Sequence, residues 1–389
     1  KANEFKDVVS LSNSGANGIS ISDSTALKLG KVSTEGNLQV SAVGVSQDAS
    51  GIKAAGNTTI SAGNASLILD AASNDFGGSV SLSNSGSNAV TLVDASALAL
   101  GASNLGSGAV NIKAAGAITQ TEVLKVAGAT TFDAGSNSIT LTRANEFGGE
   151  TKLIGSTAEI NAATALKLNL ATTGAAKVTG TDVAISGSTA ELNLTTTGAV
   201  TQTAALKVAG ASTLKVGGAM DLSQAENDFA GAVTVDGGTG TLRSANSLNV
   251  TVNNGQTLTF QAGKDLQLAG KAANLTTISG TTSKFGVVDV SGTMTMTTGG
   301  ELSLLTGGAL NVPSLVFNLP LTQDIGTQLL PFLIPSSTKV TFNSAHNGFI
   351  QIPASARTDF AVDPRVGCIR VNNGGCVNGN ASISGAIAA

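Results

Sequence analysis

Short runs in which apolar and small polar residues alternate recur along most of the chain. Val-Ser-Leu at residues 80–82, Val-Asn-Ile at 110–112 and Ile-Thr-Leu at 139–141 are examples. This period of two residues is that of a β-strand with one buried face, and the Gly, Asn, Ser and Asp residues between the runs favour turns. No segment keeps the 3.6-residue apolar period of a helix. The pattern therefore predicts an all-β protein of many short strands.

The same strands return at long, regular intervals. An Asn-acid-Phe motif occurs four times and ends at Phe5, Phe76, Phe147 and Phe229, with steps of 71, 71 and 82 residues. A second repeated stretch agrees with the longer step, because Thr-Gln-Thr followed by Leu-Lys-Val-Ala-Gly occurs at residues 119–128 and 201–210. Self-similarity of this kind is typical of repeat architectures, in which each unit packs on the next.

Side-chain size favours one of these architectures. The chain has no Trp, no Tyr and only 3% aromatic residues. Val, Leu, Ile and Ala fit the narrow interior of a right-handed parallel β-helix, in which inward side chains stack from one coil of about 20 residues to the next. We therefore predict a right-handed parallel β-helix, or solenoid, for residues 1–310. A set of ordinary β domains is the alternative.

The C-terminal part has a different composition. All six prolines, both cysteines and the single His lie after residue 312. Proline cannot donate a hydrogen bond to a strand ladder, so a less regular segment is expected there. We predict a capping segment over residues 311–366 and a separate anchor and tail over residues 367–389.

Charge and hydropathy exclude several classes of function. The net charge is −4 with scattered Lys and Arg, which gives no basic patch for nucleic acid, and 41% hydrophobic residues exclude a disordered chain. No apolar run reaches the roughly 18 to 20 residues of a membrane span. The chain opens on Lys1 without a signal segment, so we expect the natural N-terminus to lie further upstream.

Enzymatic chemistry has few candidate residues. His346 is the only His and lies in a turn-like run, so we predict no catalytic site, and the absence of clustered His, Cys or carboxylates predicts no metal site and no cofactor. Paired carboxylates could support glycoside chemistry. The acids recur with the repeat, however, as structural positions do. We interpret the Phe of the motif as a corner filler and its Asn as a turn residue, with carbohydrate stacking by the Phe as the alternative.

The two cysteines form the most informative local signal. Cys368 and Cys376 enclose seven residues, so a disulfide between them is geometrically easy. In the loop-entropy model such a ring contributes roughly 2.5 kcal/mol, which is a local effect. A structural staple and, less well supported by the spacing, redox chemistry are the alternatives. The turn that lets the chain double back consists of Asn372, Asn373, Gly374 and Gly375.

These features together resemble a known family. Ala-Asn-Glu-Phe-Gly-Gly at residues 144–149, Gly-Ala-Ile-Thr-Gln-Thr at 116–121 and Leu-Lys-Val-Ala-Gly-Ala-Thr-Thr-Phe at 124–132, followed by the terminal cysteine pair, resemble the C-terminal part of two-partner secretion exoproteins of the filamentous-haemagglutinin type. The resemblance implies a right-handed β-helix exported through a partner barrel of the outer membrane. In some members a C-terminal disulfide loop catches in that barrel, and Cys368 and Cys376 match this cysteine hook in position and spacing. The N-terminal secretion domain of the family has no counterpart in this chain.

The resemblance implies a function as well as a fold. We expect a non-enzymatic, secreted bacterial adhesin, a stalk that promotes cell–cell, biofilm or host attachment and is held at the cell surface by the Cys368–Cys376 loop. Its expected partners are the outer-membrane transporter and an extracellular polysaccharide or host surface ligand, with no nucleic acid. A polysaccharide-binding β-helix module is one alternative, and a polysaccharide-degrading β-helix enzyme is another.

Overall fold

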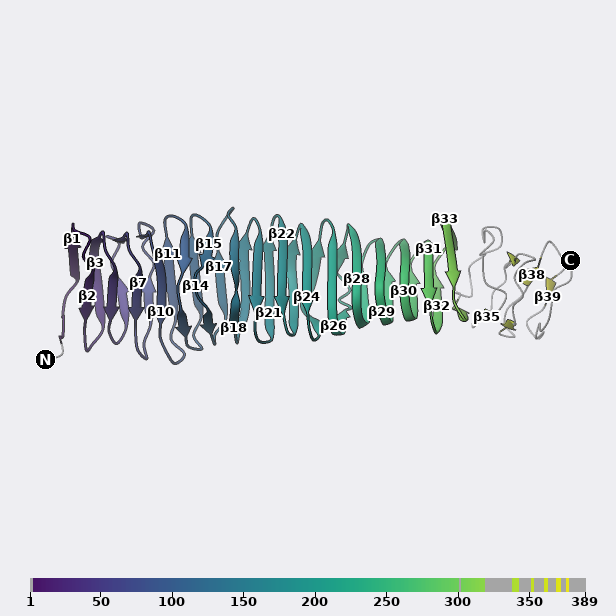
Figure 1. Ribbon diagram of the computed structural model, residues 1–389, viewed down its shortest axis with the longest axis horizontal. Coiled ribbons are helices and arrows are strands. Elements are labelled where there is room, and N and C mark those ends of the chain that lie inside the picture. Colours follow the sequence, from purple (N-terminus) through teal and green to yellow (C-terminus); the bar gives the residue numbers. More distant parts are fainter. Residues whose placement is uncertain are drawn as a thin grey trace. The chain divides into compact units, whose positions relative to one another are not determined.

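The computed structural model contains β-strands and turns, and its described residues include no helix long and apolar enough to span a membrane (Figure 1). The described residues are 3–300, 302–318, 338 and the backbone of five later strands. These strands are β35 (Lys339–Phe342), β36 (Gln351–Ile352), β37 (Phe360–Val362), β38 (Ile369–Val371) and β39 (Cys376–Val377).

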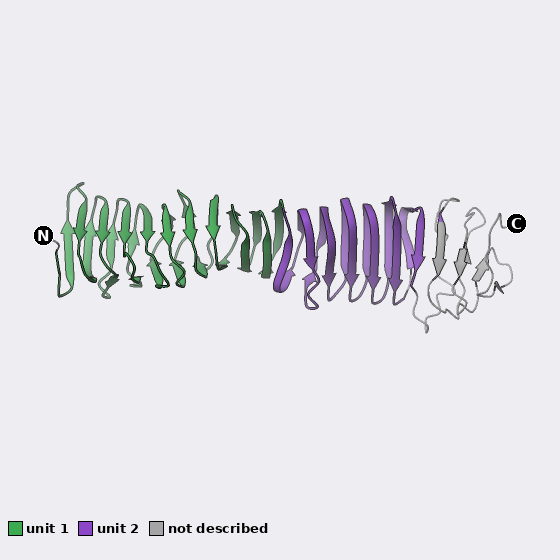
Figure 2. Cartoon of the chain, turned by 90° about the horizontal axis from the view of Figure 1, so that it is seen from below, with its two compact units in different colours: residues 1–197 green, residues 198–389 purple. Residues whose placement is uncertain are grey.

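The chain divides into two compact units, unit 1 over Lys1–Thr197 and unit 2 over Gly198–Ala389 (Figure 2). In each unit the chain winds into successive coils, and the strands of one coil pair in parallel with those of the next. The predicted all-β parallel solenoid is thereby confirmed. The two units are described separately below.

Unit 1 consists of two stacks of parallel strands, and the chain passes from one stack to the other in every coil. The first stack contains β2 (Ile19–Ser22), β4 (Leu38–Ser41), β7 (Thr58–Ser61), β10 (Ser79–Ser83), β12 (Leu98–Leu100), β13 (Ser103–Leu105), β15 (Ile118–Gln120), β16 (Leu124–Val126), β18 (Ile139–Phe147), β20 (Ala158–Ala162), β22 (Ala175–Gly180) and β24 (Glu191–Thr196). The second stack contains β1 (Val9–Asn13), β3 (Leu27–Thr34), β5 (Val45–Gln47), β6 (Ile52–Ala54), β8 (Leu67–Leu69), β9 (Asp75–Phe76), β11 (Val90–Asp94), β14 (Val110–Ala114), β17 (Thr130–Asp133), β19 (Glu150–Gly155), β21 (Leu166–Thr172) and β23 (Val183–Thr189).

The coils of unit 1 change length along the chain. Val90 pairs with Val110, a step of 20 residues, whereas Leu166 pairs with Val183, a step of 17. Inward side chains stack in register through both kinds of coil. One such column is fully buried and runs through Leu92, Ile112, Phe132, Leu153 and Leu170. Since each coil covers the apolar face of its neighbour, burial is continuous along the unit.

The 71-residue sequence repeat does not correspond to a whole number of coils. Asn3 of the first motif contacts the next coil, because its Nδ2 donates to the carbonyl of Ser22. From Ser22, six successive strand pairings along the first stack lead to Glu146 of the third motif. The first and third motifs therefore lie seven coils apart on the first stack. Asp75 of the second motif lies on the second stack, in β9. One repeat therefore advances the chain by about three and a half coils, and successive motifs of unit 1 alternate between the stacks.

Unit 2 is built from longer strands that bend around most of a coil. Its described strands before residue 318 are β25 (Val200–Val208), β26 (Ser212–Leu222), β27 (Asp228–Phe229), β28 (Ala232–Ser244), β29 (Leu248–Ala262), β30 (Leu266–Ser279), β31 (Ser283–Val290), β32 (Thr293–Thr298), β33 (Leu302–Asn311) and β34 (Ser314–Phe317). Register shifts interrupt the pairing at the bends, for example between Val252 and Gly255. Parallel pairing continues past residue 310, from β34 to β35 and on to β37. The predicted capping role of residues 311–366 remains a prediction.

A carboxylate at a turn of unit 2 gives one expected pH effect. Donation by the Thr281 and Thr282 hydroxyls, at 2.6 Å each, and by the Thr282 N–H holds the pKa of Asp265 at about 2. Because this pKa lies below the unfolded value of 3.8, the stabilisation is complete above pH 3.8 and is lost as the pH falls toward 2. Asp265→Asn is therefore expected to weaken the pH dependence of the urea midpoint between about pH 4 and 2.

The threonines supply the matched test of this effect. Thr281→Val with Thr282→Val should reduce the same part of the pH profile, and adding Asp265→Asn to that pair should change it little further. An Asp265→Asn profile that superimposes on that of the parent chain would show that these hydrogen bonds do not act on stability.

Candidate functional site

The Asn of each Asn-acid-Phe motif within unit 1 beyond the first is fully buried. Asn74 closes a turn, as expected, because its N–H donates to the Ala71 carbonyl at 3.2 Å, whereas Asn145 lies within β18. Asn145 and Gln120 of the preceding coil exchange two amide hydrogen bonds, both 2.9 Å long. Asn145 Oδ1 also accepts the Leu124 N–H at 2.9 Å, and its Nδ2 donates to the Leu141 carbonyl at 3.1 Å. The Asn side chain thus replaces ladder hydrogen bonds where the strand bends. We call this arrangement the Asn–Gln amide pair.

The same amide pair occurs at two other motifs. Asn74 pairs with Gln47 in unit 1, and Asn227 pairs with Gln202 in unit 2, at 2.7 to 2.9 Å. The Phe two residues later is buried in every one of these motifs, as expected for a filler of the coil interior, while Phe5 of the first motif is 37% exposed. The arrangement is a structural element that bridges two coils.

The acid of the motif also has a structural partner. Glu146 Oε1 lies 2.8 Å from Lys125 Nζ and Asp75 Oδ2 lies 4.0 Å from Lys53 Nζ, in each case the residue directly paired with it in the preceding coil. Lys125 belongs to the repeated Leu-Lys-Val-Ala-Gly stretch and Glu146 to the Asn-acid-Phe motif, so these two repeated stretches contact one another across adjacent coils. The carboxylates of Asp75 and Glu146 thus each pair with a lysine, whereas Asp228 of the fourth motif accepts a hydrogen bond from Asn246 Nδ2 at 3.1 Å.

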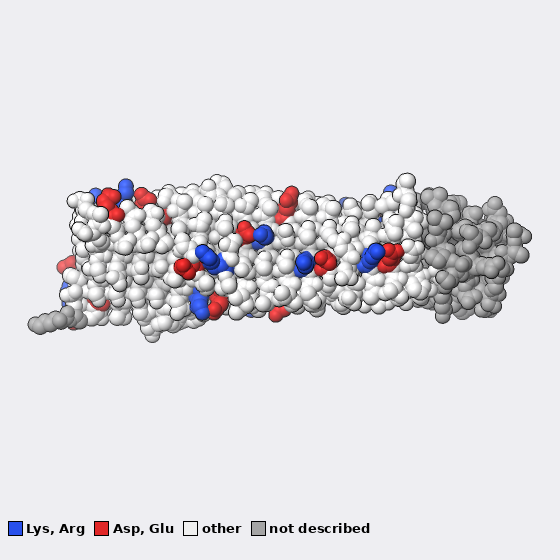
Figure 3. All heavy atoms as spheres, in the orientation of Figure 1, with Lys and Arg blue, Asp and Glu red and all other residues white. Residues whose placement is uncertain are grey.

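Surface charges of the described residues are sparse, and some of them form ion pairs between neighbouring coils. On the face drawn in Figure 3, lysines and arginines mostly lie beside an acidic side chain. Register-paired examples outside the motif are Lys113 with Asp133 at 4.0 Å and Lys177 with Glu159 at 2.7 Å. Exposed pairs of this kind contribute little stability each. Each of these pairs brings opposite charges together on the surface.

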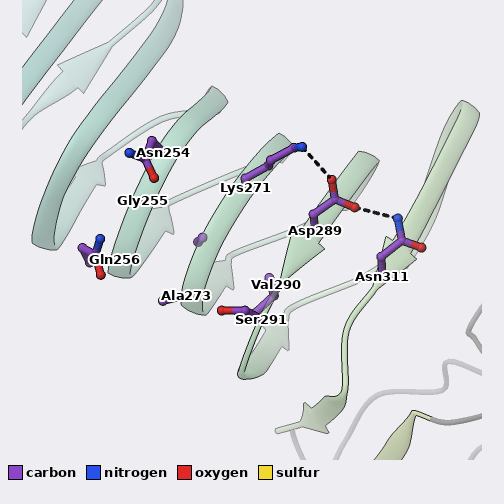
Figure 4. Close-up of a pocket in the computed structure, with 10 residues that line it drawn as sticks. Asn254, Gly255, Gln256, Lys271, Ala273, Asp289, Val290, Ser291 and Asn311 are labelled. Atoms are coloured by element: carbon purple, nitrogen blue, oxygen red, sulfur yellow. Dashed lines mark hydrogen bonds and ion pairs between the residues drawn. The ribbon is translucent and has the colours of Figure 1, made fainter.

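Unit 2 carries an open groove of about 500 Å³. Figure 4 shows its side chains projecting from successive strands, β29 through β31 and β33, with dashed lines joining Lys271, Asp289 and Asn311. The polar residues that line it are Asn254, Gln256, Lys271, Asp289, Ser291 and Asn311.

The charged part of the groove has a defined geometry. Asp289 Oδ1 accepts a hydrogen bond from Asn311 Nδ2 at 2.6 Å, and Asp289 Oδ2 lies 3.6 Å from Lys271 Nζ. The three residues are register partners in successive coils. Their side chains remain open to solvent, with 37% exposure of the Asp289 side chain and 72% of that of Lys271. A ligand can thus reach a carboxylate, an ammonium and an amide at once.

The floor of this groove is low because its residues are small. Gly255, Ala272 and Ala273 lie between the polar side chains, and the ladder shifts register between Val252 and Gly255. A shift bends the strand and turns side chains outward beside the bend. Small floor residues next to long polar ones therefore create the depression.

Unit 1 has a second, smaller depression of about 330 Å³. Hydroxyl side chains of the flat strands β7 and β10 form its floor, and the bend between β15 and β16 forms its wall. The floor includes Thr59, Ser61, Ser81 and Ser83, and the wall includes Glu122 and Lys125. Its lining also includes Asn104, and its Lys125 is paired with Glu146 at 2.8 Å.

A comparison with protein families identifies repeats of one family in this chain. A family model described as repeats of unknown function (DUF5649) matches residues 16–83, 87–154 and 173–236, which together are more than half of the chain. The chain belongs to the DUF5649 family. No curated protein and no solved structure matches it.

Each DUF5649 match contains both members of one Asn–Gln amide pair. The Asn of the pair lies nine residues before the end of every match, at Asn74, Asn145 and Asn227, and its Gln partner lies within the same match. The DUF5649 repeat is thus a segment that carries one complete bridge between coils.

The predicted site residues of the DUF5649 chain lie mostly outside the described residues. Cys368 and the turn residues Asn372, Asn373, Gly374 and Gly375 are outside them, as is His346. Of the hook, the structure describes the backbone of β38 and β39, which pair antiparallel with Arg370 opposite Cys376. The disulfide between Cys368 and Cys376 remains a prediction. Within the described residues, no group of three or more His, Cys, Asp and Glu side chains lies together.

Sequence reasoning missed the groove of unit 2. Lys271, Asp289 and Asn311 are separated by 18 and 22 residues, which brackets the length of one coil. The available signal in the sequence was a lysine, an aspartate and an asparagine spaced by about one coil length. Finding them required the register of each coil, because coils in this unit differ in length.

Proposed function

We propose that this chain is part of a non-enzymatic, secreted bacterial surface adhesin whose solenoid serves as stalk and binding surface. The observation that carries the proposal is the structural use of the repeated polar residues. The amides of three motifs bridge coils, and the acids Asp75 and Glu146 pair with lysines of the preceding coil. What repeats along the chain is therefore a device for stacking coils, which suits a protein that extends from a surface.

A stacked solenoid also fits export in the unfolded state. Each coil buries aliphatic side chains against the previous one, as in the column from Leu92 to Leu170, so coils can add sequentially without a compact nucleus. We propose that the partner is an outer-membrane transporter of the two-partner type. The Cys368–Cys376 loop would catch in its pore and hold the protein at the cell surface.

Cell fractionation tests the anchor. In cells that carry the transporter, Cys368→Ser is expected to shift the protein from the cell fraction to the medium, because the loop can no longer be closed covalently. A reducing agent should have the same effect on the parent chain and none on the variant. Ser382→Ala, outside the loop, is the matched control and should stay cell-bound. Full retention of Cys368→Ser on cells would rule out the disulfide anchor.

A polysaccharide-binding module is the second candidate function. It is favoured by the groove of unit 2, in which Lys271, Asp289 and Asn311 converge on open space. The two functions are compatible, since a stalk can carry its own binding site. Degradation of a polysaccharide is less well supported, because two of the repeated acids, Asp75 and Glu146, pair with lysines.

A further inference from the structure

We infer that the groove of unit 2 binds a segment of an uncharged polysaccharide through the side chains of Asn254, Lys271, Asp289 and Asn311. The inference deepens the proposed adhesin function and rests on it for the extracellular setting. It adds a place on the molecule and a chemical class of ligand.

Sugar hydroxyls fit the polar groups of the groove. A vicinal diol offers a donor and an acceptor side by side. The carboxylate of Asp289 can accept a hydrogen bond from a sugar hydroxyl, and Lys271 and Asn311 can donate one. Their donor nitrogens lie 3.6 Å and 2.6 Å from the two oxygens of Asp289, so the three groups are close together. The Asn254 and Gln256 amides at the other end of the groove provide both donors and acceptors. Small floor residues leave room for a ring between these groups.

The charge of the groove selects an uncharged ligand. Lys271 and Asp289 cancel one another, and the other polar residues of the lining are neutral. An acidic polymer would gain one ammonium contact but would face the carboxylate of Asp289 at close range, which opposes binding. The same argument disfavours a nucleic acid.

The position of the groove favours an extended chain over a small molecule. It crosses successive strands from β29 to β33, which are spaced by about 4.8 Å, a distance comparable to the length of one sugar residue. An extended peptide is less suitable, because β29 and β30 are each paired on both sides and have no free edge for strand addition.

A single groove is expected to bind a sugar with modest affinity, because it offers no exposed aromatic ring on which a sugar could stack. The bulky aromatic side chains near these coils, Phe260 and Phe285, are fully buried and provide no stacking platform. Val287 is 48% exposed on the same strand as Asp289, but it is not among the residues that line the groove. A polymer held at several copies of the protein on one cell would gain strength through multivalency.

The test uses affinity electrophoresis of the full chain through gels that contain dextran, mannan, galactan or, for comparison, alginate. We expect retardation by at least one neutral polymer and none by alginate. Asp289→Ala with Asn311→Ala should weaken the interaction at least about tenfold, since one charged and one neutral hydrogen-bonding group are lost. Lys113→Ala with Asp133→Ala removes a similar register pair in unit 1 and should leave retardation unchanged.

Three results would overturn the inference. They are an unchanged dissociation constant for the Asp289→Ala, Asn311→Ala chain, stronger retardation by alginate than by every neutral polymer, and no retardation by any of the neutral polymers. Thermal unfolding of both double variants must match that of the parent, which separates lost binding from lost fold. If no neutral polymer binds but Cys368→Ser still releases the protein into the medium, the inference about the groove is wrong and the anchored adhesin remains supported. If a neutral polymer binds at the groove but Cys368→Ser stays on the cells, the groove remains supported and the disulfide anchor is wrong.

Discussion

Replacement of Asn145 by leucine is expected to lower the local free energy of unfolding around β16 and β18 by about 3 to 5 kcal/mol. Leucine has nearly the same volume but no polar atoms. The buried Leu124 N–H would lose its acceptor, Asn145 Oδ1, and the Leu141 carbonyl would lose the buried hydrogen bond from Asn145 Nδ2. The half-buried amide of Gln120 would lose its two bonds to Asn145. Each unsatisfied buried group costs about 1 to 3 kcal/mol.

Native-state hydrogen exchange of the amides in β16 and β18 measures this loss directly, since opening free energies are local in a stacked repeat. Asn111→Leu makes the same substitution at an exposed strand position of unit 1 and should change protection by less than about 0.5 kcal/mol. Gln120→Leu together with Asn145→Leu should cost less than the sum of the single changes. Equal protection in Asn145→Leu and the parent would show that the amide pair does not stabilise the bend.

Replacement of Gly187 by alanine is expected to cost more than about 3 kcal/mol in the coils of β21 and β23, through two separate effects. Gly187 has φ +97°, a conformation that residues with a Cβ rarely adopt. Its Cβ would also overlap the carbonyl oxygen of Leu170, its register partner in the preceding coil. Since the coil below cannot move without breaking its own pairing, the overlap cannot be relieved cheaply.

A second glycine of unit 1 separates these two effects. Gly135 has φ +57°, and a Cβ built there meets no atom within 4 Å. Gly135→Ala is therefore expected to cost only the conformational part, about 1 to 2 kcal/mol. Hydrogen exchange in β21 and β23, compared with that in β17 and β19, distinguishes the two variants. Similar losses at both positions would mean that the close approach to Leu170 has no energetic effect.

The fold could be predicted from the sequence because its causes are local. Alternation of apolar and small polar residues defines strands, and the scarcity of aromatic residues limits the width of the interior. The burial of Phe76, Phe147 and Phe229 also followed from their recurrence among strand residues. These inferences need the order of residues within a strand and no knowledge of what lies one coil away.

The role of the motif's Asn could not be predicted in the same way. An Asn before an acid and beside Gly-rich segments has the composition of a turn. Asn145 is instead buried because coil stacking brings Gln120, 25 residues earlier, against it. The groove of unit 2 was missed for the same reason, since Lys271 and Asp289 meet only when the coil length between them is known. Contacts between coils depend on register, and coils that vary from 16 to 23 residues make that register ambiguous in the sequence.

The half-coil offset between successive motifs of unit 1 constrains how such a gene can change length. Phe5 and Phe147 lie on the first stack, and Phe76 lies on the second. Recombination that deletes one 71-residue repeat joins two nearly identical sequences, so the junction can still fold. Every residue after it would nevertheless be rotated by about half a turn relative to those before it. Loss or gain of two repeats changes the chain by seven whole coils, so the residues after the junction keep their original orientation. Loss or gain of a single repeat would instead turn surface sites after the junction to the opposite side.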